Sequence, residues 1–82
     1  MPLLTAYIQA ALRKANYERL EDGTYYGEIP DFQGVFANED SLEACRELLQ
    51  EVLEGWLLLS FDRHLPVPVV DGIDLKVTTD VA

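Results

Sequence analysis

Carboxylates are the most numerous side chains in this sequence that could do chemistry. The chain of 82 residues has 15 Asp and Glu, against 6 Lys and Arg and one His. A two-metal hydrolytic site needs several acids that converge from neighbouring strand ends. Glu28, Asp31, Asp71 and Asp74 could converge in this way, as in a residual metal-dependent nuclease. Their spacing does not compel it, and we favour a solvated acidic surface, so we predict no metal site.

The single histidine and the single cysteine also fail to define a catalytic site. His64 follows the longest predicted helix, where a cation suits the C-terminal end of the helix dipole. Cys45 stands in the middle of an apolar stripe of the same helix, which is typical of core packing. A Cys/His pair in a catalytic context and a glycine-rich phosphate loop are both missing from the sequence. We therefore predict no catalytic residue, no cofactor and no enzyme activity.

The charge distribution favours protein binding. Between residues 18 and 54 there are eleven acidic and two basic residues, a net charge of −11 + 2 = −9. Such an anionic surface repels nucleic-acid phosphates and attracts a basic partner. We therefore expect no direct nucleic-acid binding by this chain. The alternative interpretation is that the charge only keeps a small domain in solution.

Size limits the architecture to one domain, residues 1–82. A chain this short has a thin core, and one cysteine cannot form an internal disulfide. Oligomerisation is a common remedy, so we expect a homo-oligomer, either a dimer or a tetramer. The first residues lack the charge order of a signal peptide. The longest apolar run, Trp56–Leu59, is far too short to span a membrane. We expect a cytoplasmic protein with no membrane contact.

Helical and strand patterns alternate along the chain. Apolar residues recur at helical spacing over residues 3–16, with basic residues in the last turn. Residues 17–21 and 24–29 are rich in aromatic and β-branched residues, and Asp22-Gly23 between them predicts a two-residue hairpin turn. In the second strand Tyr26 and Glu28 share one face. After a turn at residues 30–34, residues 35–38 predict a third strand with Val35 and Ala37 on one face.

The long helix that follows has the strongest pattern in the sequence. Asp40 is a suitable N-cap, and Glu43 three residues later fits a capping box. The predicted helix ends near residue 62. Its central apolar stripe is Leu42, Cys45, Leu49, Val52, Trp56 and Leu59, flanked by Leu48 and Leu53. Its last turns are apolar almost all the way round, which one sheet face cannot cover, so the extra side meets the N-terminal helix, a second subunit, or both. The residues that we predict to join subunits are Trp56, Leu57, Leu58 and Phe61.

The remaining chain predicts an extended segment and a last strand. Prolines exclude helix over residues 65–69. Asp71-Gly72 predicts a turn, and Ile73, Leu75 and Val77 alternate with polar residues as in a strand. The predicted fold class is therefore α+β in the order α-β-β-β-α-β, with an antiparallel meander sheet packed on one long helix.

Residues 25–44, from Tyr25 to Ala44, resemble the HicB family, the antitoxin components of HicA–HicB toxin–antitoxin pairs. In that family a strand ends in an acidic residue, an apolar residue and Pro, as at residues 28–30. An acidic residue, an apolar residue, any residue and Gly follow, as at residues 31–34. A short strand, an acidic residue, Ser or Thr and an Ala-containing helix complete the pattern, as at residues 35–44. The resemblance extends over residues 17–75.

The resemblance implies a partial ribonuclease-H-like fold without nuclease activity, made of a HicB-like core over about residues 17–77 and an extra N-terminal helix over about residues 3–16. It also implies a partner, a basic HicA-like toxin ribonuclease. We expect Glu28, Asp31, Phe32 and Glu39 to contact that toxin. The sequence resembles the short, stand-alone type without a C-terminal DNA-binding region. The alternative is a stand-alone homo-oligomeric structural or regulatory module without a toxin.

Overall fold

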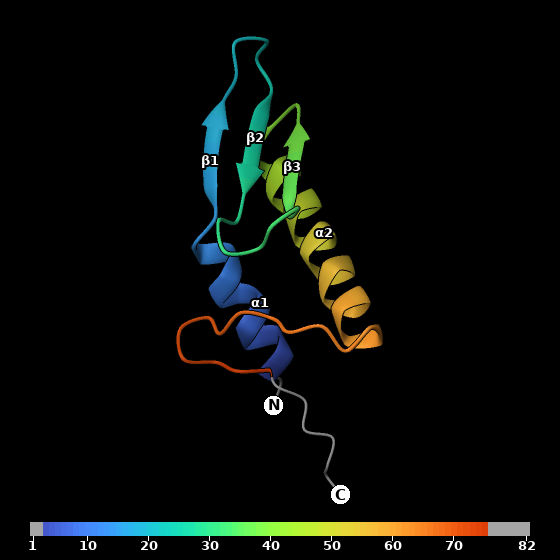
Figure 1. Ribbon diagram of the computed structural model, residues 1–82. Coiled ribbons are helices and arrows are strands. Elements are labelled where there is room, and N and C mark those ends of the chain that lie inside the picture. Colours follow the sequence, from blue (N-terminus) through green and yellow to red (C-terminus); the bar gives the residue numbers. More distant parts are fainter. Residues whose placement is uncertain (1–2, 76–82) are drawn as a thin grey trace, which may run out of the picture.

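The computed structural model describes residues 3–75 as two helices and one small sheet (Figure 1). The elements in chain order are α1 (Leu3–Arg13), β1 (Asn16–Arg19), β2 (Tyr25–Glu28), β3 (Phe36–Glu39) and α2 (Leu42–Asp62). The three strands form an antiparallel meander in the order β1-β2-β3. The predicted α+β class and the order of these five elements are confirmed.

Helix α1 is amphipathic, and its apolar side is in the core. Tyr7, Ile8, Ala10 and Ala11 are buried, whereas the basic residues Arg13 and Lys14 are exposed at its end. The helix ends at Arg13, about three residues earlier than the sequence pattern predicted. Two short i→i+3 bonds, from Lys14 N–H to Ala11 C=O and from Ala15 N–H to Leu12 C=O, tighten its last turn.

The β1–β2 hairpin has a different turn from the predicted one. Leu20 N–H donates to Thr24 C=O, and Gly23 N–H donates to Leu20 C=O, so three residues lie in the loop. Gly23 has a positive φ of 89°, but Asp22 does not have a positive φ. This is a three-residue loop with glycine in the left-handed position, not a two-residue Asp-Gly turn. The Asp22 carboxylate instead accepts hydrogen bonds from the backbone N–H and the hydroxyl of Thr24.

The loop between β2 and β3 packs inward. Within residues 30–34 the side chain of Phe32 is only 2% exposed. Its ring meets Tyr7 of α1 edge to face at 6.2 Å and Trp56 of α2 at 5.1 Å. Such perpendicular aromatic contacts add stability beyond their buried area. Phe32 therefore joins α1, the sheet and α2 in one core.

Helix α2 begins one residue later than the capping box predicted. The N-cap is Ser41, whose hydroxyl accepts a hydrogen bond from Ala44 N–H. The residue three positions after this N-cap is Ala44, so Asp40 and Glu43 do not form the predicted box. The helix buries Cys45, Leu49, Leu53, Leu57 and Ser60. This stripe is rotated from the predicted one, because Leu42 and Leu59 are 43% and 48% exposed.

After α2 the chain turns sharply and crosses α1 (Figure 1). His64 takes a positive φ of 57°, and Leu65 N–H donates to Ser60 C=O, which closes the helix end. The Tyr7 hydroxyl donates to the Pro68 carbonyl. Asp71 forms ion pairs with Lys14 at 2.9 Å and with Arg13 at 3.9 Å. These contacts fasten the segment 64–75 to α1.

The predicted last strand is reduced to one bridge within the described residues. Val70 and Ile73 exchange two backbone hydrogen bonds around Asp71-Gly72, both of which have positive φ. This is the two-residue turn geometry that the sequence predicted for the other Asp-Gly pair. Lys76 and Val77, which belonged to the predicted strand, lie outside the described residues.

Candidate partner-binding surface

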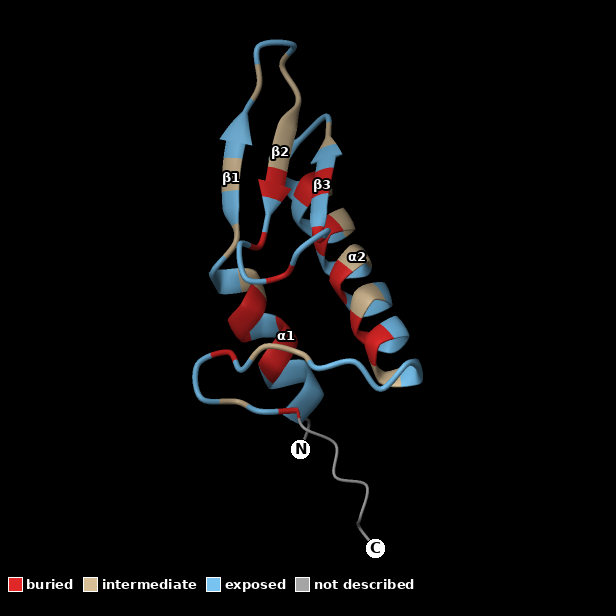
Figure 2. Ribbon diagram, viewed as in Figure 1, coloured by how far each residue is buried: buried red, intermediate tan, exposed pale blue. Residues whose placement is uncertain are grey.

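The sheet is covered on one face and open on the other. Helix α2 contacts β2 and β3 from one side, and the buried Gly27 and Ala37 point toward it. Because side chains alternate along a strand, their neighbours point the other way. The open face of the sheet consists of Asn16, Glu18, Tyr26, Glu28, Phe36 and Asn38. All of them are exposed except Tyr26, which is half-buried; in Figure 2 β1 is mostly pale blue, whereas β2 is mostly tan and red.

Two aromatic rings stand together on the open face. Tyr26 and Phe36 stack with their centroids 6.1 Å apart and an interplanar angle of 28°. Phe36 is 54% exposed, which is unusual for so large an apolar side chain on a sheet. Aromatic side chains are enriched where proteins bind other proteins, since they bury large areas and keep few rotatable bonds. The stacked pair can therefore anchor a partner.

Carboxylates flank this aromatic pair. The Tyr26 hydroxyl donates to Glu28 Oε1 at 3.2 Å, and Glu18 is the cross-strand partner of Tyr26. Burial, the hydrogen bond to Glu28 and the negative charges of Glu28 and Glu18 raise the pKa of Tyr26, in that order. Carboxylates beside aromatic rings suit a guanidinium or ammonium group, which ring faces also attract.

The four predicted partner-binding residues do not share one surface. Glu28 lies on the open face, and Asp31 is exposed in the 30–34 loop. Glu39 pairs with Tyr25 at the other end of the ladder and points to the α2 side. Phe32 is buried in the core, so it does not present its side chain to a partner. Sequence reasoning missed Glu18, Tyr26 and Phe36, although the strand alternation already separated Tyr26 and Phe36 from the core-facing residues.

The four predicted subunit-contact residues also differ in their surroundings. Leu57 is 2% exposed and packs in the core of its own chain. Trp56 and Phe61 are half-buried against the core. Leu58 alone is strongly exposed, at 69%. Because of its position on the helix, Leu58 points away from the sheet.

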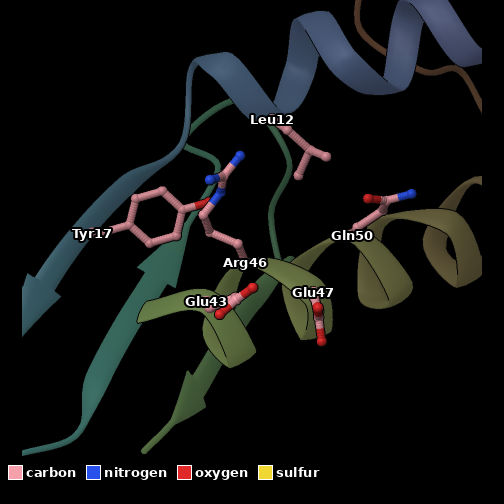
Figure 3. Close-up of a pocket in the computed structure, with 6 residues that line it drawn as sticks. All are labelled: Leu12, Tyr17, Glu43, Arg46, Glu47 and Gln50. Carbon is pink, nitrogen blue, oxygen red and sulfur yellow. The ribbon is translucent and has the colours of Figure 1, made fainter. Parts of the chain in front are cut away.

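A polar groove lies where the end of α1, β1 and the first half of α2 meet (Figure 3). Its volume is about 220 Å³, and it is lined by Leu12, Tyr17, Glu43, Arg46, Glu47 and Gln50. Burial raises the pKa of Tyr17, while the charge of Arg46 and a hydrogen bond from its guanidinium oppose that rise. Tyr17 and Arg46 therefore lie next to each other in this groove.

The remaining candidate chemistry is not assembled within residues 3–75. No three His, Cys, Asp or Glu side chains there come together as a set that could hold a metal ion, and this includes Glu28, Asp31, Asp71 and Asp74. Cys45 is buried, donates to the Ala37 carbonyl at 3.5 Å, and has a pKa raised first by burial. Neither helix within the described residues is long and apolar enough to cross a membrane.

A sheet backed by a helix on one face and open on the other defines a small α+β protein with a one-sided sheet. The chain belongs to the UPF0150-like family, whose model matches residues 6–68. That family is small and related to HicB. The fold is similar to the crystal structure of TTHA0281 from Thermus thermophilus, with a TM-score of 0.88 and 39% sequence identity over 95% of this chain and 98% of that one. No curated protein matches this chain.

Proposed function

We propose that this protein is an antitoxin-type binding protein that neutralises a basic HicA-like toxin ribonuclease. The observation that carries the proposal is the open sheet face, where the stacked Tyr26 and Phe36 rings lie beside Glu18 and Glu28. Membership of a HicB-related family is compatible with this role. The proposed activity is stoichiometric binding, not catalysis.

Electrostatics supports a basic partner in particular. Thirteen charged side chains between residues 18 and 54 sum to −9, and the open face carries two of the carboxylates and no basic residue. A ribonuclease must hold RNA phosphates with basic side chains. An acidic, aromatic surface can occupy those side chains and exclude RNA from them, and complementary charge speeds the encounter.

The test uses a purified HicA-like toxin with a basic RNA-binding surface and measures both binding and RNA cleavage. We expect a complex that stops cleavage and weakens as salt is added, because its ion pairs are screened. The double variant Glu18→Lys/Glu28→Lys should weaken binding by at least about tenfold, or 1.4 kcal/mol. The matched control is Glu51→Lys/Glu54→Lys, which makes the same charge change on exposed residues of α2.

Three results would count against the proposal. The first is that the toxin and this chain form no complex. The second is that they form a complex that leaves RNA cleavage unchanged. Equal weakening by both double variants would mean that net charge alone, and not the open face, governs binding. Replacing Tyr26 and Phe36 together by Ala separates the aromatic contribution, and it should also reduce affinity.

A further inference from the structure

The outer edge of β3 offers unpaired backbone groups. Ile29 N–H donates to Val35 C=O, so residues 29 and 35 form a hydrogen-bonded pair. Such pairs alternate along an antiparallel ladder, which makes Gly27 and Ala37 the next one. The N–H and C=O groups of Phe36 and Asn38 therefore point away from β2. Within residues 3–75 no other strand pairs with this edge.

Beside this edge lies an apolar side of α2 that we call the α2 flank: Leu48, Val52, Gly55 and Leu59. Their spacing of four, three and four residues places them in one row along the helix. The polar groove that contains Arg46 is on the opposite side of α2, next to α1 and β1, so the α2 flank is on the β3 side. Leu59 is 48% exposed, and a side-chain atom added at Gly55 would meet nothing within 4 Å.

The two features are spaced so that one copy of the chain fits another. Helix α2 packs over β2 and β3, and neighbouring strands lie about 4.8 Å apart. If two β3 edges pair antiparallel about a two-fold axis, each α2 axis lies about one strand spacing from that axis. The two helices are then about 10 Å apart, close to the 8–10 Å of packed helices. Strand pairing and helix packing would thus form together.

The charges exclude a basic partner from the α2 flank and favour a second copy. All four flank residues are uncharged over twelve positions, although α2 carries Glu43, Glu47, Glu51 and Glu54 on its other exposed sides. A basic protein would find no carboxylate on the flank. Two chains of net charge −9 can meet there without placing carboxylates opposite each other. Isologous contacts of this kind are the commonest route to homodimers.

We propose that two copies of this chain form a two-fold dimer through the β3 edge and the α2 flank, which joins the two sheets into one. The proposal does not depend on the toxin. Phe36 of one copy would exchange backbone hydrogen bonds with Asn38 of the other, and the two α2 flanks would pack antiparallel. This contact differs from the one predicted from sequence, because Leu57 is buried in its own chain and Leu58 points elsewhere.

The test is the mass in solution of the unsubstituted chain and of Gly55→Glu. We expect twice the chain mass of 9.3 kDa for the first and 9.3 kDa for the second. A Cβ at position 55 meets nothing within 4 Å, and glutamate is a better helix former than glycine, so the variant should fold, as circular dichroism can verify. The matched control Leu58→Glu adds the same charge at an exposed residue off the flank and should keep the mass of the dimer.

Amide hydrogen exchange gives a second measurement. The Phe36 and Asn38 N–H groups should exchange slowly in the unsubstituted protein and rapidly in Gly55→Glu, whereas Ala37 N–H, bonded to β2, stays protected in both. A monomeric unsubstituted chain at high concentration, or a dimer that Gly55→Glu leaves intact, would overturn the proposal. A monomer whose toxin binding is lost in Gly55→Glu would assign the flank to the toxin.

Discussion

The ring of Tyr17 lies over Gly27, its partner on the neighbouring strand. A Cβ on Gly27 would lie 2.8 Å from both Cδ1 and Cε1 of Tyr17 and 3.2 Å from Sγ of Cys45. The ring therefore fills the space that a side chain at position 27 would take. The Arg46 side chain lies beside the Tyr17 hydroxyl in the polar groove.

Gly27→Ala should destabilise the fold by about 1–3 kcal/mol, the usual cost of an added methyl group in a packed core. Urea denaturation measures the change in free energy of unfolding. The matched control is Gly55→Ala, which adds the same methyl group where nothing lies within 4 Å. In a helix that change should stabilise by up to about 1 kcal/mol. If Gly27→Ala left the free energy of unfolding unchanged, the Tyr17 ring would move aside at no cost.

The N-cap assignment of α2 gives a second prediction. Ser41→Ala removes the oxygen that accepts from Ala44 N–H, and it should cost about 0.5–2 kcal/mol of stability. Asp40→Ala should change stability much less, because Asp40 precedes the N-cap and makes no capping contact in the structure. Thermal unfolding of both variants measures the difference. A larger loss of stability in Asp40→Ala than in Ser41→Ala would identify Asp40 as the N-cap.

Because of Tyr7, the free energy of unfolding should depend on pH in the alkaline range. Burial first, and then the charges of Asp74 and Asp31, raise the pKa of Tyr7 from 10.0 to about 12. Because the folded state holds this proton more tightly than the unfolded state, the contribution is complete below pH 10 and is lost as pH rises toward 12. The free energy of unfolding, measured across this range, should fall less steeply in Tyr7→Phe.

The same variant also loses the hydrogen bond from the Tyr7 hydroxyl to the Pro68 carbonyl, so at neutral pH it should be less stable by about 0.5–1.5 kcal/mol. If the free energy of unfolding fell with the same slope at alkaline pH in Tyr7→Phe and in the unsubstituted protein, the titrating group would be another residue. Tyr17, whose pKa is also raised, would be an example.

Local sequence patterns predicted the helices and strands well. Tertiary contacts decided which face of α2 is buried, and local hydrogen bonds decided the turn type. The row of apolar residues in α2 predicted its length, but the exact face depends on which side the sheet and α1 cover. Asp22-Gly23 and Asp71-Gly72 have the same sequence, and yet only the second forms a two-residue turn with both φ values positive. The side-chain hydrogen bonds from Thr24 to Asp22 favour the longer first loop.

The site was harder to predict than the fold. Phe32 was assigned to the partner on the basis of resemblance, and no local pattern shows that the 30–34 loop folds inward between Tyr7 and Trp56. The open face is a property of the whole sheet, because it exists only where no second layer covers the strands. Alternation separated Tyr26 and Phe36 from the core, but only the three-dimensional arrangement shows them stacked.

Because of the edge-to-face contact between Phe32 and Trp56, the intrinsic fluorescence of Trp56 can report on the position of the 30–34 loop. Trp56 is the single tryptophan in the chain and is half-buried. Its fluorescence emission therefore comes from one place, the junction of the 30–34 loop with α1 and α2. A shift of that emission toward longer wavelength would record undocking of this loop without any added dye.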